Sequence, residues 1–168
     1  MATTIGRSLL LLLSALGAAC GADRGTLGTP DSTSAMLDEA TSENVRHAEV
    51  CRHATSMPDM LSDVARHELT MNGITARMME ANDGMRTDMM QGHACSEQPF
   101  DNMSQDLTGT NAEVALHTTR MQGLDNVGAG HYECAVHLGE LRKELDSMRT
   151  DLATMPCSPN GTSATAVP

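Results

Sequence analysis

Two histidine–cysteine pairs carry the spacing of a metal site. His47 and Cys51 are four residues apart and His131 and Cys134 are three apart, so in helices each pair lies on one face. Two helices that each supply one pair can complete a tetrahedral His2Cys2 site, which suits zinc. In an exported protein, thiols are more often oxidised than bound to metal. The first twenty residues of this chain predict export, as described below. We therefore expect a disulfide with buried, hydrogen-bonded histidines, and the metal site is the alternative.

Methionine is unusually frequent, with 14 residues in a chain of 168. Thioether sulfur is a soft ligand that selects Cu(I), and Met79, Met90 and His93 cluster towards one end of a predicted helix. Methionine is also an adaptable core residue, so a methionine stripe at helical spacing is core by default. We therefore expect no cofactor, with copper or zinc binding as the alternative.

Four Glu-x-x-x-His pairs place a carboxylate and an imidazole on the same helical face: Glu43/His47, Glu49/His53, Glu113/His117 and Glu133/His137. Such pairs can form the carboxylate–imidazole shell of a metal. The commoner role of this spacing is a solvent-facing ion pair, and this is the role we expect.

No motif for catalysis or nucleic-acid binding is present in the sequence. It has no glycine-rich phosphate loop, no His-Glu-x-x-His and no Cys-x-x-Cys-His. The net charge of −11 argues against nucleic acid as a partner, because phosphate binding requires clustered basic residues. We therefore expect neither enzymatic activity nor nucleic-acid binding.

The elements that must position these residues are helices. One tyrosine and one phenylalanine are too few aromatic residues for a typical β core. Apolar residues recur at helical spacing, most clearly at Leu138, Leu141, Leu145 and Met148. We predict an all-α, antiparallel four-helix bundle, with helices at residues 34–57, 58–93, 102–122 and 129–155.

The bundle predicts how the cysteines pair. Cys51 lies near the end of the first helix and Cys134 near the start of the fourth, which meet at one end of an antiparallel bundle. Cys95 and Cys157 each follow a helix at the opposite end. Joining Cys134 to Cys157 would span roughly 35 Å along one helix, beyond the reach of a disulfide. We predict the disulfides Cys51–Cys134 and Cys95–Cys157.

The first twenty residues have the pattern of an export signal. Arg7 precedes an apolar run from Leu9 to Ala15, and the small residues after it lead into Cys20. This resembles a bacterial lipoprotein signal, which implies cleavage before Cys20, a lipid on that cysteine and attachment to a membrane. By the same resemblance, Gly21 implies the outer membrane if the cell is Gram-negative. Cleavage near Ala19 without lipid, giving a soluble periplasmic or secreted protein, is the alternative.

The expected organisation is a signal peptide (1–19), a lipidated cysteine with a flexible linker (20–34), a helical bundle (35–157) and a disordered tail (158–168). The expected function is a non-catalytic binding or structural module of the cell envelope, with an unknown protein as a possible partner. The alternative is a copper- or zinc-binding protein for metal storage or buffering, built on methionine, histidine and cysteine.

Overall fold

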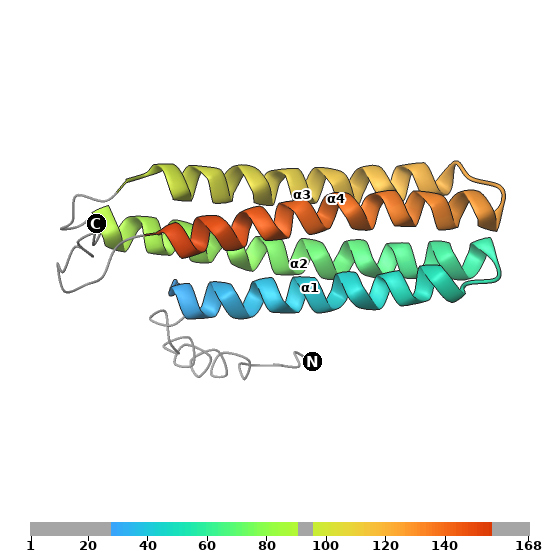
Figure 1. Cartoon of the computed structure of the whole chain (residues 1–168), viewed down its shortest axis with the longest axis horizontal. Helices are drawn as coiled ribbons and strands as arrows, with labels where there is room; N and C mark the ends of the chain where they lie inside the picture. Colours follow the sequence, from blue (N-terminus) through green and yellow to red (C-terminus); the bar gives the residue numbers. More distant parts are fainter. Residues whose placement is uncertain (1–27, 91–95, 156–168) are drawn as a thin grey trace, which may run out of the picture.

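A computed structural model describes residues 28–90 and 96–155 of the chain. It confirms the predicted helical bundle (Figure 1), with α1 Pro30–His53, α2 Met57–Met90, α3 Gln98–Gln122 and α4 Val127–Thr154. The predicted signal with Cys20, the predicted Cys95–Cys157 pair, His93 and the predicted tail lie outside the described residues. Within the described ranges, no helix combines the length and apolarity needed to cross a bilayer.

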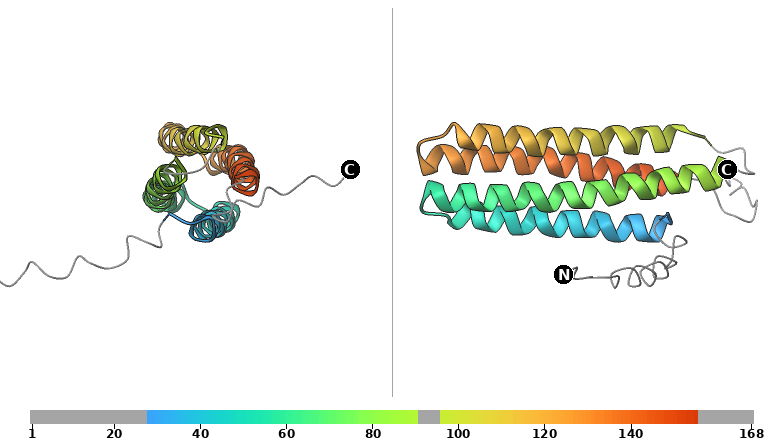
Figure 2. Two further views of the ribbon diagram at one scale, coloured as in Figure 1. Left: turned by 90° about the vertical axis from the view of Figure 1, so that its left-hand side faces the viewer. Right: turned by 180° about the vertical axis from the view of Figure 1, so that it is seen from behind.

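The four helices form a ring around a shared axis (Figure 2). Each helix packs against its neighbours in chain order, and α1 also packs against α4 to close the ring. Helices α2 and α4 have only slight contact, and α1 and α3 face each other diagonally. Side chains from diagonal helices therefore meet only on the axis of the bundle.

The helices begin earlier than the sequence pattern indicated. Helix α1 starts at Pro30, inside the predicted linker, because the Thr29 side chain accepts the Ser32 backbone N–H at 3.2 Å and Pro30 fits the first turn. Helix α3 starts at Gln98, with Pro99 in its first turn. The Thr29 cap of α1 and the proline in the first turn of each of these helices lie ahead of the apolar stripe, which only becomes clear further along each helix.

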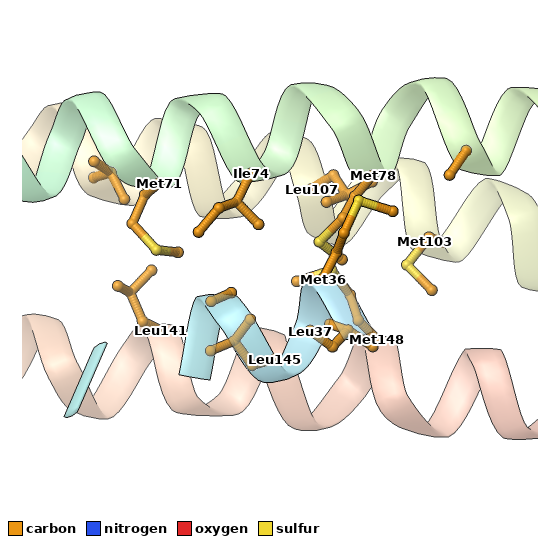
Figure 3. Close-up of a cluster of buried hydrophobic side chains, with 13 residues drawn as sticks. Met36, Leu37, Met71, Ile74, Met78, Met103, Leu107, Leu141, Leu145 and Met148 are labelled. Atoms are coloured by element: carbon orange, nitrogen blue, oxygen red, sulfur yellow. The ribbon is translucent and has the colours of Figure 1, made fainter. Parts of the chain in front are cut away.

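Most of the buried methionines lie in the larger of two apolar clusters (Figure 3). Met71, Met78, Met103 and Met148 are at most 1% exposed and pack with leucines from α1, α3 and α4. Met79 is partly buried against the same cluster. These positions are therefore core, as a methionine stripe at helical spacing predicts by default.

A smaller apolar cluster lies at the end of the bundle that holds the α1–α2 and α3–α4 turns. It consists of buried Cys51, Met60, Val64, Met121 and Cys134. At Gly130 the backbone of α4 comes so close to Met60 that an added Cβ would lie 2.9 Å from its sulfur. Between the two apolar clusters, each helix contributes a buried histidine.

Candidate metal centre

Four histidines, one from each helix, form a layer across the bundle core. His47, His67, His117 and His137 are 0–1% exposed. The helical periodicity that places leucine and methionine in the core also places these histidines there, because each lies on the buried face of its helix. Side chains so deeply buried must find their hydrogen-bond partners inside the protein.

The four rings are arranged as two stacks that face each other across the axis. His47 stacks on His67 with ring centroids 4.1 Å apart, and His117 stacks on His137 at 3.9 Å. Across the diagonals, Nε2 of His47 lies 3.3 Å from Nε2 of His117, and Nε2 of His67 lies 3.3 Å from Nε2 of His137. The Nε2 atoms therefore meet in two diagonal pairs inside the bundle.

The other ring nitrogen of each histidine faces a carboxylate on the neighbouring helix. Nδ1 lies 2.7 Å from Asp63 in His47, 3.0 Å from Glu43 in His67 and 3.3 Å from Glu113 in His137. In His117 the corresponding distance, to Glu133, is 3.6 Å, and this Nδ1 has no hydrogen-bond partner. The carboxylates lie outside the ring of imidazoles, where they orient the rings.

The site is built twice from the same spacing. Each carboxylate lies four residues before a histidine on its own helix and faces Nδ1 of the histidine on the other helix of that hairpin. The α1–α2 set recurs 70 residues later in α3–α4, and both diagonal histidine contacts join residues 70 apart. The two hairpins are thus related by an approximate twofold arrangement about the bundle axis.

Three arginines neutralise most of the carboxylate charge. Arg46 bonds Asp63 at 2.6 Å and Glu43 at 2.8 Å, and Arg66 reaches the same two carboxylates. In the second hairpin Arg120 lies 3.3 Å from Glu133. Three guanidiniums against the four carboxylates leave the shell with one negative charge if all of these groups are ionised.

Burial keeps the imidazoles neutral. It lowers the pKa of His117 to about 3 and those of His67 and His137 to about 2, helped by the neighbouring histidines. Burial also lowers the pKa of His47, against the opposing effect of Asp63. A neutral imidazole carries one proton. In His67 and His137 the proton belongs on Nδ1, which donates to a carboxylate, so both Nε2 atoms carry lone pairs.

This donor set fits a transition-metal ion. Two lone pairs that face each other at 3.3 Å repel unless a cation lies between them. Two nitrogens bound to one tetrahedral ion at ~2.0 Å are separated by about 3.3 Å, which matches both diagonal distances. Ring nitrogens of His47, His117 and His137 already lie within 4.8 Å of one another. Histidines that bind metal commonly donate their other N–H to a carboxylate, and Nδ1 of His47, His67 and His137 lies within hydrogen-bond distance of one.

The predicted disulfide between Cys51 and Cys134 is present and links α1 to α4, with Cα atoms 6.3 Å apart. It borders the histidine layer, because Sγ of Cys51 lies 3.5 Å from Nε2 of His47. The prediction succeeded because both cysteines lie on buried helix faces at the same end of the bundle.

His131 does not join the other residues of the predicted His2Cys2 site. A ring nitrogen of His47 and the sulfurs of Cys51 and Cys134 lie within 4.8 Å of one another. His131 is exposed, and its Nε2 lies 3.1 Å from the carbonyl oxygen of Ala54 at the end of α1. It follows the buried Gly130 by one position, which turns its side chain away from the core.

The Glu-x-x-x-His pairs behave as predicted at only one of four positions. Glu49 and His53 form an exposed pair, with oxygen and nitrogen 3.4 Å apart. The expectation of solvent-facing pairs is wrong for His47, His117 and His137, which are buried and face carboxylates of other helices.

His67 is the one histidine of the layer that was not predicted as a site residue or as part of a Glu-x-x-x-His pair. The available signal was Asp63, four residues before His67, and the repetition of this pattern 70 residues later. Of the predicted copper ligands, Met79 packs against the core, whereas His93 and the side chain of Met90 lie outside what the structure describes.

Comparisons with known proteins add no further assignment. No protein-family model matches the chain, and neither the curated proteins nor the solved structures include a significant match to it.

Proposed function

We propose that this protein is a non-catalytic metal-binding module of the cell envelope that holds one transition-metal ion among four core histidines. The observation that carries the proposal is the contact between His67 and His137. Both Nδ1 atoms face carboxylates, and both Nε2 lone pairs meet at 3.3 Å in a fully buried site. A cation on the bundle axis would turn this repulsion into coordination.

The ligand chemistry selects the metal class. Neutral imidazoles are borderline ligands that suit Zn²⁺ and Cu²⁺, and the Nε2 separations match the tetrahedral geometry of zinc. A shell with one net negative charge offsets part of the charge of a divalent ion. We therefore propose zinc as the best-fitting ion, with Cu²⁺ as its competitor.

Full burial of the ligands supports binding over catalysis. Catalytic zinc sites usually combine three protein ligands with a position open to water or substrate, whereas structural sites are closed by four protein ligands. Four imidazoles at 0–1% exposure correspond to the closed type. A stored, buffered or structural ion fits this arrangement, and the lipid proposed on Cys20 would hold the module at the membrane.

Metal titration of the purified, chelator-stripped chain tests this proposal. We expect one Zn²⁺ or Co²⁺ per chain by calorimetry and native mass spectrometry, with tetrahedral Co²⁺ absorption. His67→Gln removes one Nε2 ligand and should weaken binding at least 10-fold. His53→Gln is the matched control, because His53 is exposed and forms only a surface pair, and it should bind as the wild type does. Equal binding by the His67→Gln and wild-type proteins would exclude the four-imidazole site.

A further inference from the structure

The disulfide is placed where a second set of metal ligands would lie if it were reduced. Sγ of Cys51 is 3.5 Å from Nε2 of His47, and these atoms and the sulfur of Cys134 fall within 4.8 Å of one another. All three residues are at least 96% buried, since their exposed fractions are 4% or less. The helices therefore already bring together two sulfurs and one imidazole nitrogen.

A surface cavity leads to this disulfide. It has a volume of about 250 Å³ and is lined by Ala48, Cys51, Arg52, His131, Cys134, Ala135 and Leu138. The four-histidine layer itself is closed to solvent. A reductant or a metal ion approaching from this face would meet the sulfurs before it met the inner imidazoles.

The spacing of the two cysteines fits a shared metal ion. Their Cα atoms are 6.3 Å apart, and two thiolates bound to one tetrahedral zinc ion at about 2.3 Å lie about 3.8 Å apart. Two thiolates and an imidazole form a softer site than four imidazoles.

We propose that Cys51–Cys134 is a redox gate and that its reduced form, together with His47, is the entry and exit site for the metal. A dithiol reductant transfers two electrons and two hydrogens, so the Cys51–Cys134 bond breaks and the reductant becomes a disulfide. The two thiols then lose their protons to solvent as they bind a zinc-class ion with His47. Reoxidation by exchange with a small-molecule disulfide, which accepts the two electrons and leaves as two thiolates, would re-form the Cys51–Cys134 bond, remove both sulfur ligands and leave the ion to the inner imidazoles.

His47 connects the two sites. Its Nε2 lies 3.5 Å from Cys51 Sγ and 3.3 Å from His117 Nε2, so one imidazole serves either the sulfur site or the four-imidazole site. Transfer between the sites rests on the proposed function, but binding at the sulfur site does not. The two proposals can therefore fail separately.

Cobalt spectroscopy distinguishes the sites on the intact chain. Protein that is loaded with Co²⁺ in its reduced form and then reoxidised should give tetrahedral d–d bands without thiolate charge transfer. Reduction should add near-ultraviolet thiolate-to-cobalt charge transfer and speed the loss of Co²⁺ to a chelator at least 10-fold. The Cys51→Ser/Cys134→Ser variant is the matched control, because it lacks the crosslink but has no thiolates at these positions. Under reducing conditions it should lack the added absorption and release Co²⁺ slowly.

A second variant separates the two proposals. His67→Gln removes a ligand of the four-imidazole site only, so the reduced variant should retain the thiolate charge transfer. If the reduced wild-type protein gives no more of this absorption than the double serine variant, the sulfur site is excluded. If both proteins release Co²⁺ equally fast, loss of the crosslink alone explains release and the redox gate is wrong.

Discussion

Each imidazole of the histidine layer depends on the group behind it. Asp63 accepts from Nδ1 of His47 at 2.7 Å and is itself held by Arg46 and Arg66. Such carboxylates fix the tautomer and orientation of a metal-binding ring and raise its basicity. Asp63→Asn preserves the shape but removes the charge, so we expect the affinity for Zn²⁺ to fall about 10–100-fold.

Competition with a chromogenic chelator measures this affinity. Glu49→Gln is the matched control, because Glu49 pairs with Arg52 and His53 at the surface and touches none of the four core histidines. It should leave the affinity unchanged. An Asp63→Asn protein with wild-type affinity would show that the carboxylate does not orient His47.

At the scale of the helices, methionine in the core should be replaceable by another apolar residue of similar volume. Met78 is 1% exposed and packs in the larger apolar cluster. Met78→Leu should cost less than about 1.5 kcal/mol of the free energy of unfolding and leave Zn²⁺ binding intact. Met78→Ala leaves a cavity and should cost about 2–5 kcal/mol. Urea denaturation measures both, and loss of metal binding in Met78→Leu would contradict a purely packing role.

The Cys51–Cys134 disulfide between α1 and α4 should also stabilise the arrangement of the helices. The two cysteines are 83 residues apart in the sequence. Closing a loop of this length lowers the chain entropy of the unfolded state, which stabilises the native state by about 4–5 kcal/mol. The measured stabilisation by disulfides is often smaller than this. We expect the double serine variant at Cys51 and Cys134 to melt well below the oxidised protein. Addition of a reductant should lower the melting temperature of the wild-type protein towards that of the variant. Equal melting temperatures of the oxidised wild type and the variant would contradict this stabilisation.

Much of the arrangement of helices was predictable from the sequence, and much of the site was not. The buried stripe of α4 and the shared position of Cys51 and Cys134 depend only on helical period and antiparallel order. The carboxylate that a buried histidine contacts depends on how the two neighbouring helices are rotated about their axes. His67 and Glu43 therefore meet although 24 residues separate them, and no spacing within one helix reveals this contact.

For the whole molecule, the four buried histidines predict a strong dependence of stability on pH in the metal-free state. Their pKa values are lowered on folding, to about 2 for His67 and His137 and about 3 for His117. Below the unfolded-state pKa of about 6.5, the unfolded chain binds more protons than the native protein. Stability is therefore greatest above this pH and falls as the pH decreases, by up to about 1.4 kcal/mol per pH unit for each histidine.

The charged groups around the histidine layer change how steeply the free energy of unfolding depends on pH, but near neutral pH they do not change the direction of this dependence. Burial raises the pKa values of Glu43 and Glu113, so these carboxyls take up protons at a higher pH in the native state than in the unfolded chain and offset part of the loss of stability. The positive charges of Arg46 and Arg120 lower the pKa values of the rings and so oppose their protonation. Urea denaturation of the metal-free chain between pH 7.5 and 5 should thus show a steep fall in the free energy of unfolding.

Zinc should shift this acid transition, because an ion that binds only the native state stabilises it by mass action. Protons and the ion compete for the same Nε2 atoms, so a saturating concentration of Zn²⁺ should move the loss of stability to lower pH. The His67→Gln protein should show a smaller shift, since one ligand is missing. An acid transition that Zn²⁺ leaves in place would indicate that the imidazoles form a polar core layer and not a metal site. The same packing of the four rings is compatible with a polar core layer and with a metal site. The size of the shift in the acid transition on addition of Zn²⁺ therefore distinguishes these two roles.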